Sequence, residues 1–297
     1  MRIVFLNLQS AKLPSSHHST PSINRSILPS SSFSFQTSSF HFFYIAFTCL
    51  GHWNLPTAIT MVAQEFTVDL NKPLVFQVGH LGEAYQEWVH QPIVSKERPR
   101  FFKSDFWEFC TRTAWWVVPL IWLPVVCWFV SMSVNMGHTL PQISLMVIFG
   151  ISIWTLIEYI VHRFLFHIET QSYWGNTMHY LIHGCHHKHP MDSLRLVFPP
   201  TATAVLLVPI WNLVKLFFPP SMAPALFGGG LLGYVIYDIT HYYLHHGQPT
   251  GDVPKKLKKY HMNHHFRILN KGFGVTSPLW DRAFGTLPAS KVAAKTR

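Results

Sequence analysis

The four segments HRFLFH (162–167), HGCHH (183–187), HYYLHH (241–246) and HMNHH (261–265) decide how this chain folds. Thirteen of its 20 histidines lie between residues 162 and 265, most of them at these short spacings. Neutral imidazole is a good ligand for iron, zinc, copper and nickel. The groups therefore predict a metal centre that gathers distant parts of the chain.

The spacing within each group predicts how the imidazoles point. Residues three or four positions apart share one face of an α-helix. The expected face-sharing pairs are His183 with His186, His241 with His245, and His261 with His264. His187 and His265 follow at a rotation of about 100°, so each doublet can offer one imidazole to each of two metal ions. His162 and His167 are five apart, do not share an α-helical face, and are expected to bracket the point where a membrane helix ends or bends.

Four apolar stretches predict an all-α integral membrane protein, since only 12% of residues are charged and 48% are apolar. The stretches are 114–136, 141–161, 203–218 and 222–243. A helix needs about 20 apolar residues to span a bilayer, so the first, second and fourth are long enough. The third is shorter and contains Lys215, which leaves a buried or half-inserted helix as its alternative. The expected fold is four transmembrane helices in two hairpins, with a histidine-rich helical cap on the cytosolic side.

The distribution of basic residues predicts the orientation of these helices. Lysine and arginine are frequent between residues 255 and 297, whereas the short links 137–140 and 219–221 contain neither. Loops rich in lysine and arginine usually face the cytosol. The carboxy-terminal tail is therefore expected there, with both links on the opposite side. All four histidine groups then meet at the cytosolic face of the membrane.

The chain is expected to divide into three parts. Residues 1–60 have no acidic residue and are rich in serine, which predicts a disordered extension that is either a targeting sequence or a non-native start. Residues 61–113 carry aromatic and basic residues, and Pro92 and Pro99 interrupt any long helix, so this part is expected on the cytosolic membrane surface. Residues 114–290 form the predicted membrane domain.

The net charge of +10 does not indicate nucleic-acid binding. No basic soluble domain with an element that could read a nucleic-acid sequence is recognisable.

Two carboxylates lie within the apolar stretches, where ionisable groups are costly and usually functional. Glu158 precedes His162 by four residues, and Asp238 precedes His241 by three. Each is expected to accept the second ring N–H of a liganding histidine and so to fix its tautomer. Direct metal ligation and a structural hydrogen bond are the alternatives. His179 and His246 are expected either to orient the liganding histidines or to have no role at the site, rather than to bind metal.

The number of histidines indicates the kind of chemistry. Ten histidines shared between two ions give five nitrogen donors each, whereas a structural zinc ion needs four. Two redox-active irons could use O2, two electrons and two protons to oxidise an unactivated C–H bond. Zinc-dependent hydrolysis would need fewer ligands and an open water position. A site beside hydrocarbon favours an acyl chain or a sterol as the substrate, and the protein would position the target carbon and exclude water.

The four histidine groups resemble those of the fatty acid hydroxylase superfamily of membrane di-metal oxygenases. The chain is more closely similar to the plant fatty acid 2-hydroxylases, also called dihydroceramide fatty acyl 2-hydroxylases. The additional stretches that carry this similarity are VGHLGEAYQEWVHQPI (78–93), FPP (198–200) and GFGVTSPLWDRAFGTLP (272–288). The resemblance covers about residues 62–288. It implies O2-dependent 2-hydroxylation of the N-acyl chain of ceramide-type sphingolipids in the endoplasmic reticulum membrane.

The resemblance also implies the ligands and the electron donor. A pair of metal ions, iron in the working enzyme with zinc as another occupant, is expected at His162, His167, His183, His186, His187, His241, His245, His261, His264 and His265. Fungal and animal relatives carry a fused cytochrome b5 domain with an HPGG motif. This sequence contains no HPGG, as in the plant relatives, so electrons are expected from a separate cytochrome b5 and its NADH-dependent reductase.

A lysine cluster and two rival functions complete the expectations. Lys255, Lys256, Lys258 and Lys259 are candidates for docking cytochrome b5, with contact to anionic lipid head groups as the alternative.

The first alternative function is that of another lipid oxidase of the superfamily, namely a sterol C4-methyl oxidase, a sterol desaturase or a carotenoid hydroxylase. The second is a non-enzymatic zinc-binding or zinc-transporting membrane protein. The gathering of histidines at one membrane face disfavours transport, because transporters place ligands along a path at mid-membrane.

Overall fold

The computed structural model describes residues 66–95 and 97–288. All described residues belong to one compact unit. The disordered extension expected over residues 1–60 lies outside the described residues. Every regular element within the described ranges is a helix, as predicted. In chain order the elements are α1 (Val75–Val78), η1 (Gly79–Ala84), α2 (Tyr85–Val89), α3 (Asp105–Cys110), α4 (Val117–Asn135), α5 (Leu140–Ile160), η2 (Val161–Phe166), α6 (Tyr173–His179), η3 (Tyr180–Gly184), α7 (Cys185–Lys188), α8 (Pro200–Phe217), α9 (Ala223–His246), α10 (Asp252–Phe266) and α11 (Leu279–Ala283).

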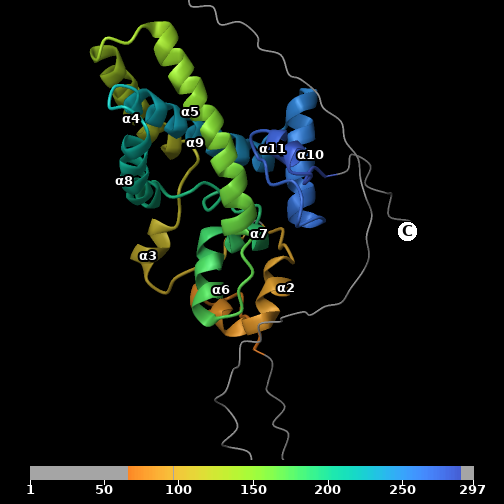
Figure 1. Cartoon of the computed structure of the whole chain (residues 1–297). Coiled ribbons are helices and arrows are strands. Elements are labelled where there is room, and N and C mark those ends of the chain that lie inside the picture. Colours follow the sequence, from red (N-terminus) through yellow and green to blue (C-terminus); the bar gives the residue numbers. More distant parts are fainter. Residues whose placement is uncertain (1–65, 96, 289–297) are drawn as a thin grey trace, which may run out of the picture. The chain divides into compact units, whose positions relative to one another are not determined.

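Among the described residues, three helices are long and apolar enough to cross a membrane: α4, α5 continued by η2, and α8. The stretch whose length was marginal, 203–218, therefore does form a candidate span. α5 starts at a capping box, in which Thr139 and Gln142 each accept a hydrogen bond from the other's backbone N–H. From the turn after α4, α5 runs to the region of α6 and α7 (Figure 1).

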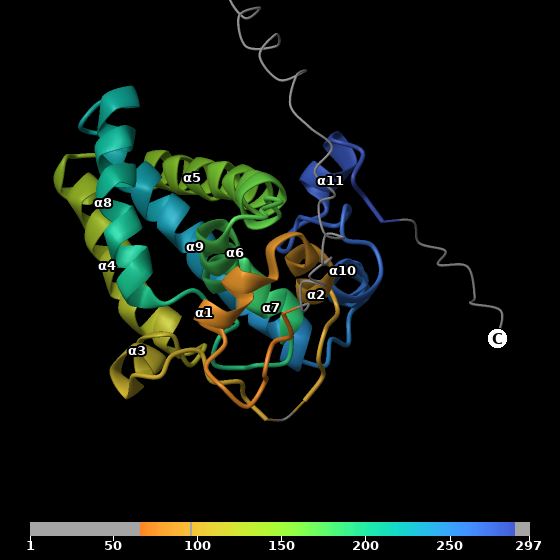
Figure 2. The same ribbon diagram turned by 90° about the horizontal axis from the view of Figure 1, so that it is seen from below.

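The fourth predicted stretch, 222–243, forms α9, but α9 is not among the candidate spans. Its composition explains the difference, because three consecutive glycines, Asp238 and several tyrosines lower its hydropathy. Fifteen residues of α9 are buried, whereas Thr203 is the one buried residue of α8. α9 passes between α4 and α5 (Figure 2), and a helix covered by protein needs less apolar surface than one that faces lipid. By length and composition, the structure thus supports three of the four predicted spans.

Glycines allow α9 to approach α5 closely. A Cβ atom on Gly229 would lie 2.4 Å from the carbonyl oxygen of Val147, and one on Gly150 would lie 2.3 Å from that of Leu226. Small residues at a helix crossing let two backbones touch in this way. The packing carries the histidine-bearing end of α9 toward the end of α5.

The segment before α4 packs onto the helices that carry histidines. Val75, Val78, Tyr85, Val89 and Tyr180 are among the residues of one buried apolar cluster that joins α1, η1 and α2 to η3. As expected from Pro92 and Pro99, no helix runs through the described residues 90–95 and 97–104. The segment is therefore a set of short helices that share a core with the histidine-bearing part.

A buried ion-pair network holds α3 in place. The Arg195 guanidinium contacts the carboxylates of Glu108 and Asp192, and it also lies over the ring of Phe101, 3.9 Å from the centroid. Glu108 accepts hydrogen bonds from the backbone N–H groups of Phe101 and Phe102 at 2.8 and 2.9 Å. A buried charge needs such compensation to be tolerated. The network ties the segment that leads into α4 to the loop that follows α7.

The last part of the described chain lies against the end of α5. The hydroxyl groups of Tyr159 and Thr286 are 2.9 Å apart, and the Trp280 indole N–H donates to the Thr155 hydroxyl at 3.0 Å. The residues after α10 therefore cover the end of α5 that leads into η2 and His162.

Candidate metal centre

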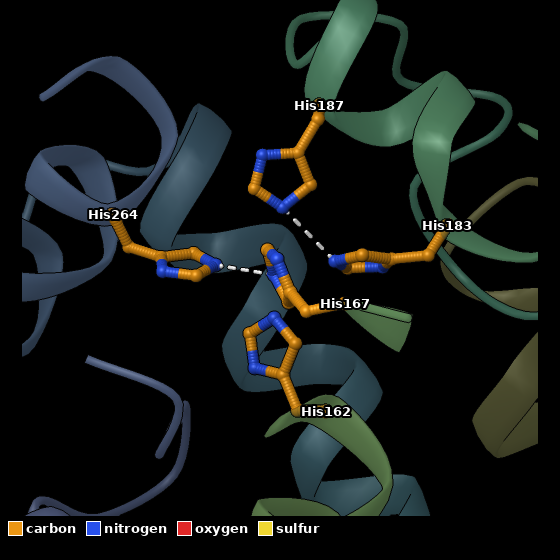
Figure 3. Close-up of side chains that lie close together, drawn as sticks. All are labelled: His162, His167, His183, His187 and His264. Atoms are coloured by element: carbon orange, nitrogen blue, oxygen red, sulfur yellow. Dashed lines mark hydrogen bonds between the residues drawn. The ribbon is translucent and has the colours of Figure 1, made fainter. Parts of the chain in front are cut away.

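All ten histidines predicted as ligands gather in two groups of five. The first group is His162, His167, His183, His187 and His264, and the second group is His186, His241, His245, His261 and His265. Within each group, the candidate ligand nitrogens all lie within 4.8 Å of one another. Figure 3 shows how the rings of the first group surround a common space. Each group takes side chains from at least three elements that are distant in sequence.

The histidine doublets divide between the two groups as helical rotation predicts. His187 and His264 belong to the first group, whereas their neighbours His186 and His265 belong to the second. The about 100° that separates adjacent residues on a helix turns one ring of each doublet toward each group. The two groups are therefore adjacent and share the backbones of α7 and α10.

Of the three histidine pairs predicted to share a helix face, the structure confirms one and contradicts two. His241 and His245 do fall in the same group, but His183 groups with His187 and His261 with His265. The Nε2 atoms of both observed pairs are 3.1 Å apart. Residues four apart differ by about 40° around an α-helix and residues three apart by about 60°. In both places where a histidine has one neighbour three positions away and another four positions away, the one four positions away therefore joins its group.

A π-helical turn corrects the expectation for His162 and His167. These residues belong to one group, and their ring centroids are 5.2 Å apart. η2, which begins at Val161, is a π-helix, whose hydrogen bonds join residues five apart and stack them on one side. α-Helical geometry was the wrong assumption at this position. η3, which contains His183, is a second π-helical turn.

The arrangement of ring nitrogens fits a cation in each group. His261 Nε2 lies 2.9 Å from His241 Nε2 and 2.8 Å from His245 Nε2. In the first group, the Nε2 atoms of His167 and His264 are 2.9 Å apart. One imidazole nitrogen cannot satisfy several others by hydrogen bonds. Nitrogen donors that converge in a buried space are the arrangement that a metal ion stabilises.

The protonation of these rings favours metal binding. Burial lowers the pKa of His183, His186 and His187 well below its ordinary value, and the neighbouring imidazoles lower it further. The pKa values of His261, His264 and His265 are lowered in the same way and by the same causes, burial first. Removal from water disfavours the charged form of a histidine. The rings therefore stay neutral and keep a lone pair free.

The two carboxylates have partners other than histidine. Glu158 accepts hydrogen bonds from the backbone N–H groups of Val275 and Thr276 at 2.7 and 2.8 Å. Asp238 accepts one from the backbone N–H of Phe198 at 3.3 Å. Neither is hydrogen-bonded to a ring nitrogen within the described part of the chain, so the expected direct contact with a ligand is wrong. Both Glu158 and Asp238 instead make structural hydrogen bonds to backbone N–H groups, which was one of the two alternatives.

His179 and His246 lie outside both groups. The His179 ring bridges the Tyr85 hydroxyl at 2.6 Å and the carbonyl oxygen of Phe166 at 2.8 Å, which fastens the end of η2 to α2. His246 packs against Tyr242, with ring centroids 4.8 Å apart, and lines a cavity of about 620 Å³. The rings of His179 and His246 are therefore separate from the ring nitrogens that converge in the two groups.

The lysine cluster lies in the first half of α10. Lys258 donates to the carbonyl oxygen of Gly247 at 2.7 Å, while Lys255, Lys256 and Lys259 are exposed. The side chains at three of the four positions are therefore accessible.

Sequence reasoning missed two kinds of partner. The carbonyl oxygens of Phe273 and Lys271 lie 2.6 and 2.9 Å from the Nδ1 atoms of His162 and His264. His90 was also missed, although it lies in the quoted stretch 78–93. Its ring centroid is 5.3 Å from that of His187, and its Nε2 atom is buried without a hydrogen-bond partner among the described residues. A lone histidine carries no spacing signal, and a backbone carbonyl carries no sequence signal at all.

Comparisons with known proteins agree with this geometry. The family model for fatty acid hydroxylase matches residues 147–286. Dihydroceramide fatty acyl 2-hydroxylase FAH1 of Arabidopsis thaliana is 72% identical over 235 residues, which cover 79% of this chain and 99% of that protein. Fatty acid 2-hydroxylase of Rattus norvegicus is 44% identical over 243 residues, which cover 74% of this chain and 64% of that protein. A solved structure of full-length scs7p, in which only the hydroxylase domain is visible, has a TM-score of 0.71 and 40% sequence identity, and the match covers 76% of this chain and 87% of that one.

Proposed function

Because the chain belongs to the fatty acid hydroxylase family and is a hydroxylating enzyme, we propose that it hydroxylates C2 of the N-acyl chain of a ceramide-type sphingolipid. The observation that carries this proposal is the 72% identity to a protein named for dihydroceramide fatty acyl 2-hydroxylation, over 99% of its length. More distant relatives from yeast and mammals are named for the same position or for ceramide fatty acids. The substrate class is therefore a sphingolipid rather than a sterol or a carotenoid.

The two groups of five histidines are the proposed ligands of two metal ions, one for each group. Iron is the proposed working metal, and zinc is an alternative occupant, since imidazole binds both. Bound iron would supply the capacity to activate O2. Each turnover then consumes one O2, two electrons and two protons, and it yields the hydroxylated lipid and one water.

The chain's own residues provide a dry, neutral and oriented environment. Nine of the ten histidines are buried, and His167 is half-buried, so bulk water is kept from the reacting centre. Backbone carbonyls hold the His162 and His264 rings in place, and ligands oriented in this way need not reorganise during the reaction. Excluding water protects a strong oxidant from side reactions.

We place the enzyme in the endoplasmic reticulum membrane with four transmembrane helices, α9 included. One apolar cluster and one histidine, at opposite ends of α9, support a full crossing by this helix. Ala225 and Leu226 pack against Ile143 and Met146 near the start of α5, whereas the other end of α9 carries His245 into the second group. α9 therefore extends along the same depth as α5. Both histidine groups then lie at the cytosolic ends of the helices, within reach of a lipid held in that leaflet.

The functional parts of the chain remain those proposed from its sequence. Residues 114–290 form the catalytic membrane domain, and residues 61–113 form a segment at the cytosolic membrane surface. A separate cytochrome b5, reduced by its NADH-dependent reductase, is the proposed electron donor. The exposed lysines of α10 are the proposed docking site for its acidic surface.

Expression in cells that lack their own acyl 2-hydroxylase tests the function. Mass spectrometry of extracted lipids should reveal ceramides with a 2-hydroxy acyl chain. His183→Ala should abolish that product while the protein stays in the membrane fraction. An oxidised sterol or carotenoid in place of hydroxyceramide would favour a different lipid oxidase. Zinc accumulation without any oxidised lipid would favour the non-enzymatic alternative.

A further inference from the structure

The segment 271–276 (KGFGVT), which we call the strap, contacts the first group through two carbonyl oxygens. His162 Nδ1 faces the carbonyl of Phe273 at 2.6 Å, and His264 Nδ1 faces that of Lys271 at 2.9 Å. A carbonyl oxygen only accepts, so each Nδ1 carries the proton. Both rings are thereby held in one tautomer, in which Nε2 is unprotonated and directs its lone pair toward the rest of the group.

Two carboxylates hold four consecutive backbone N–H groups of the strap. Asp281 accepts from Phe273 at 3.0 Å and from Gly274 at 2.8 Å, one bond to each carboxylate oxygen. Glu158 accepts from Val275 at 2.7 Å and from Thr276 at 2.8 Å, and its other oxygen accepts from the Thr276 hydroxyl at 2.5 Å. With these amides held, the peptide planes between them cannot turn, and the carbonyl of Phe273 stays aimed at His162.

The glycines of the strap make this course of the backbone feasible. Gly272 has φ 82°, a left-handed conformation that favours glycine. A Cβ atom on Gly274 would lie 2.2 Å from the carbonyl oxygen of Ser277 and 3.0 Å from Asp281 Oδ2. Both positions thus need a residue without a side chain for the carboxylates to reach the amides.

The second group has no comparable support. The Nδ1 atoms of His261 and His265 are buried and have no hydrogen-bond partner among the described residues. Among the described residues, the hydrogen bonds between the strap and ring nitrogens are therefore made with the first group.

We propose that Glu158 and Asp281 are positioning residues for the first group. By holding the strap, they fix the tautomer and direction of His162 and His264 and so control metal occupancy of that group alone. The inference rests on the proposed metal centre. It assigns Glu158 a role that acts through the backbone of a distant segment rather than through a histidine.

The zinc content of the purified full chain in detergent, after loading with Zn²⁺ alone, tests the inference. Glu158→Leu keeps a side chain of similar size that suits an apolar helix but removes both acceptor oxygens. Glu158→Gln keeps one carbonyl oxygen for the amides of Val275 and Thr276. We expect about two zinc ions in the wild type and in Glu158→Gln. Glu158→Leu should hold about one, since lost orientation of metal ligands weakens binding by about 10–100-fold.

Double variants identify the group that is emptied. Glu158→Leu combined with His264→Ala should lose no more zinc than either change alone, because both act on the first group. Glu158→Leu combined with His245→Ala should empty both groups. Thr155→Val is the matched control. It removes the hydrogen bond from Trp280 on the same face of α5 but leaves the amides of the strap untouched, so it should keep both ions.

Three results would overturn the inference while leaving the metal centre intact. These are two zinc ions in Glu158→Leu, an additive loss with His264→Ala, or an equal loss in Glu158→Gln, which would indicate charge rather than hydrogen bonding. A fourth such result is loss of one ion in Thr155→Val, which would show that any disturbance of this region suffices. A wild-type chain that binds no zinc would instead refute the proposed centre itself.

Discussion

Adjacent histidines of this protein have unlike surroundings. His245 turns its ring into the second group, whereas His246, one position later, packs on Tyr242 outside both groups. His186 and His187 likewise face different groups. The angle at which a ring leaves its helix therefore decides its role, and residue type alone does not.

The pair His245 and His246 yields a prediction at this scale. His245→Ala should remove one nitrogen donor from the second group, lower its metal occupancy and reduce 2-hydroxylated ceramide by at least about 100-fold. His246→Ala should keep both ions and most of the product. Metal analysis of the purified variants and lipid mass spectrometry provide the two measurements. Equal losses in both variants would contradict the assignment.

The ten histidines could be predicted from the sequence because their short spacings are local. Their hydrogen-bond partners could not. Glu158 is four residues from His162, yet it bonds to Val275, more than a hundred positions later. Spacing along a helix carries no information about a strap that approaches from elsewhere. The proximity of Glu158 and His162 in sequence therefore pointed to the wrong partner.

Among the helices, α9 and the π-helical turns show where local rules fail. The turn at η2 inserts one extra residue per turn and brings His162 and His167 into one group. No residue in VHRFLF marks that change. α9 can be less apolar than a lipid-facing helix, because α4 and α5 cover it. Apolar length thus predicts which helices form, but not which of them is central.

The glycines of α9 provide a matched pair of substitutions. Gly229→Ala should destabilise the protein by about 1–3 kcal/mol, as overpacking in a close interface does, because the new Cβ would meet Val147 at 2.4 Å. Gly230→Ala should be within about 0.5 kcal/mol of the wild type, since the nearest atom there is 3.8 Å away. Thermal unfolding in detergent measures both. Similar melting temperatures for the two variants would refute the close approach of α9 and α5.

Across the whole described unit, the two short links meet at one end. His138 Nε2 and the carbonyl oxygen of Ser221 are 2.9 Å apart, so the α4–α5 and α8–α9 hairpins turn on the same side. The histidine groups lie at the opposite ends of α5 and α9. Such an arrangement fits four crossings, with every second connection on the side of the metal ligands.

Cysteine labelling in sealed microsomes checks this topology. Lys256→Cys, in the exposed part of α10, should react with a membrane-impermeant maleimide in intact vesicles. Ser221→Cys should react only after the vesicles are permeabilised, because the proposed topology places its link in the lumen. The wild-type chain corrects for its native cysteines. If α9 does not cross the membrane, both engineered cysteines will react from the same side.

The contribution of α10 to both groups has a consequence for biosynthesis. His264 completes the first group, and His261 and His265 complete the second, yet all three are translated after every membrane helix has been made. Until α10 is made, the nascent chain therefore has four of the five histidines of the first group and three of the five of the second. The second group can reach its full set of five nitrogen ligands only after α10 has been translated, whereas the first group lacks a single histidine before that point.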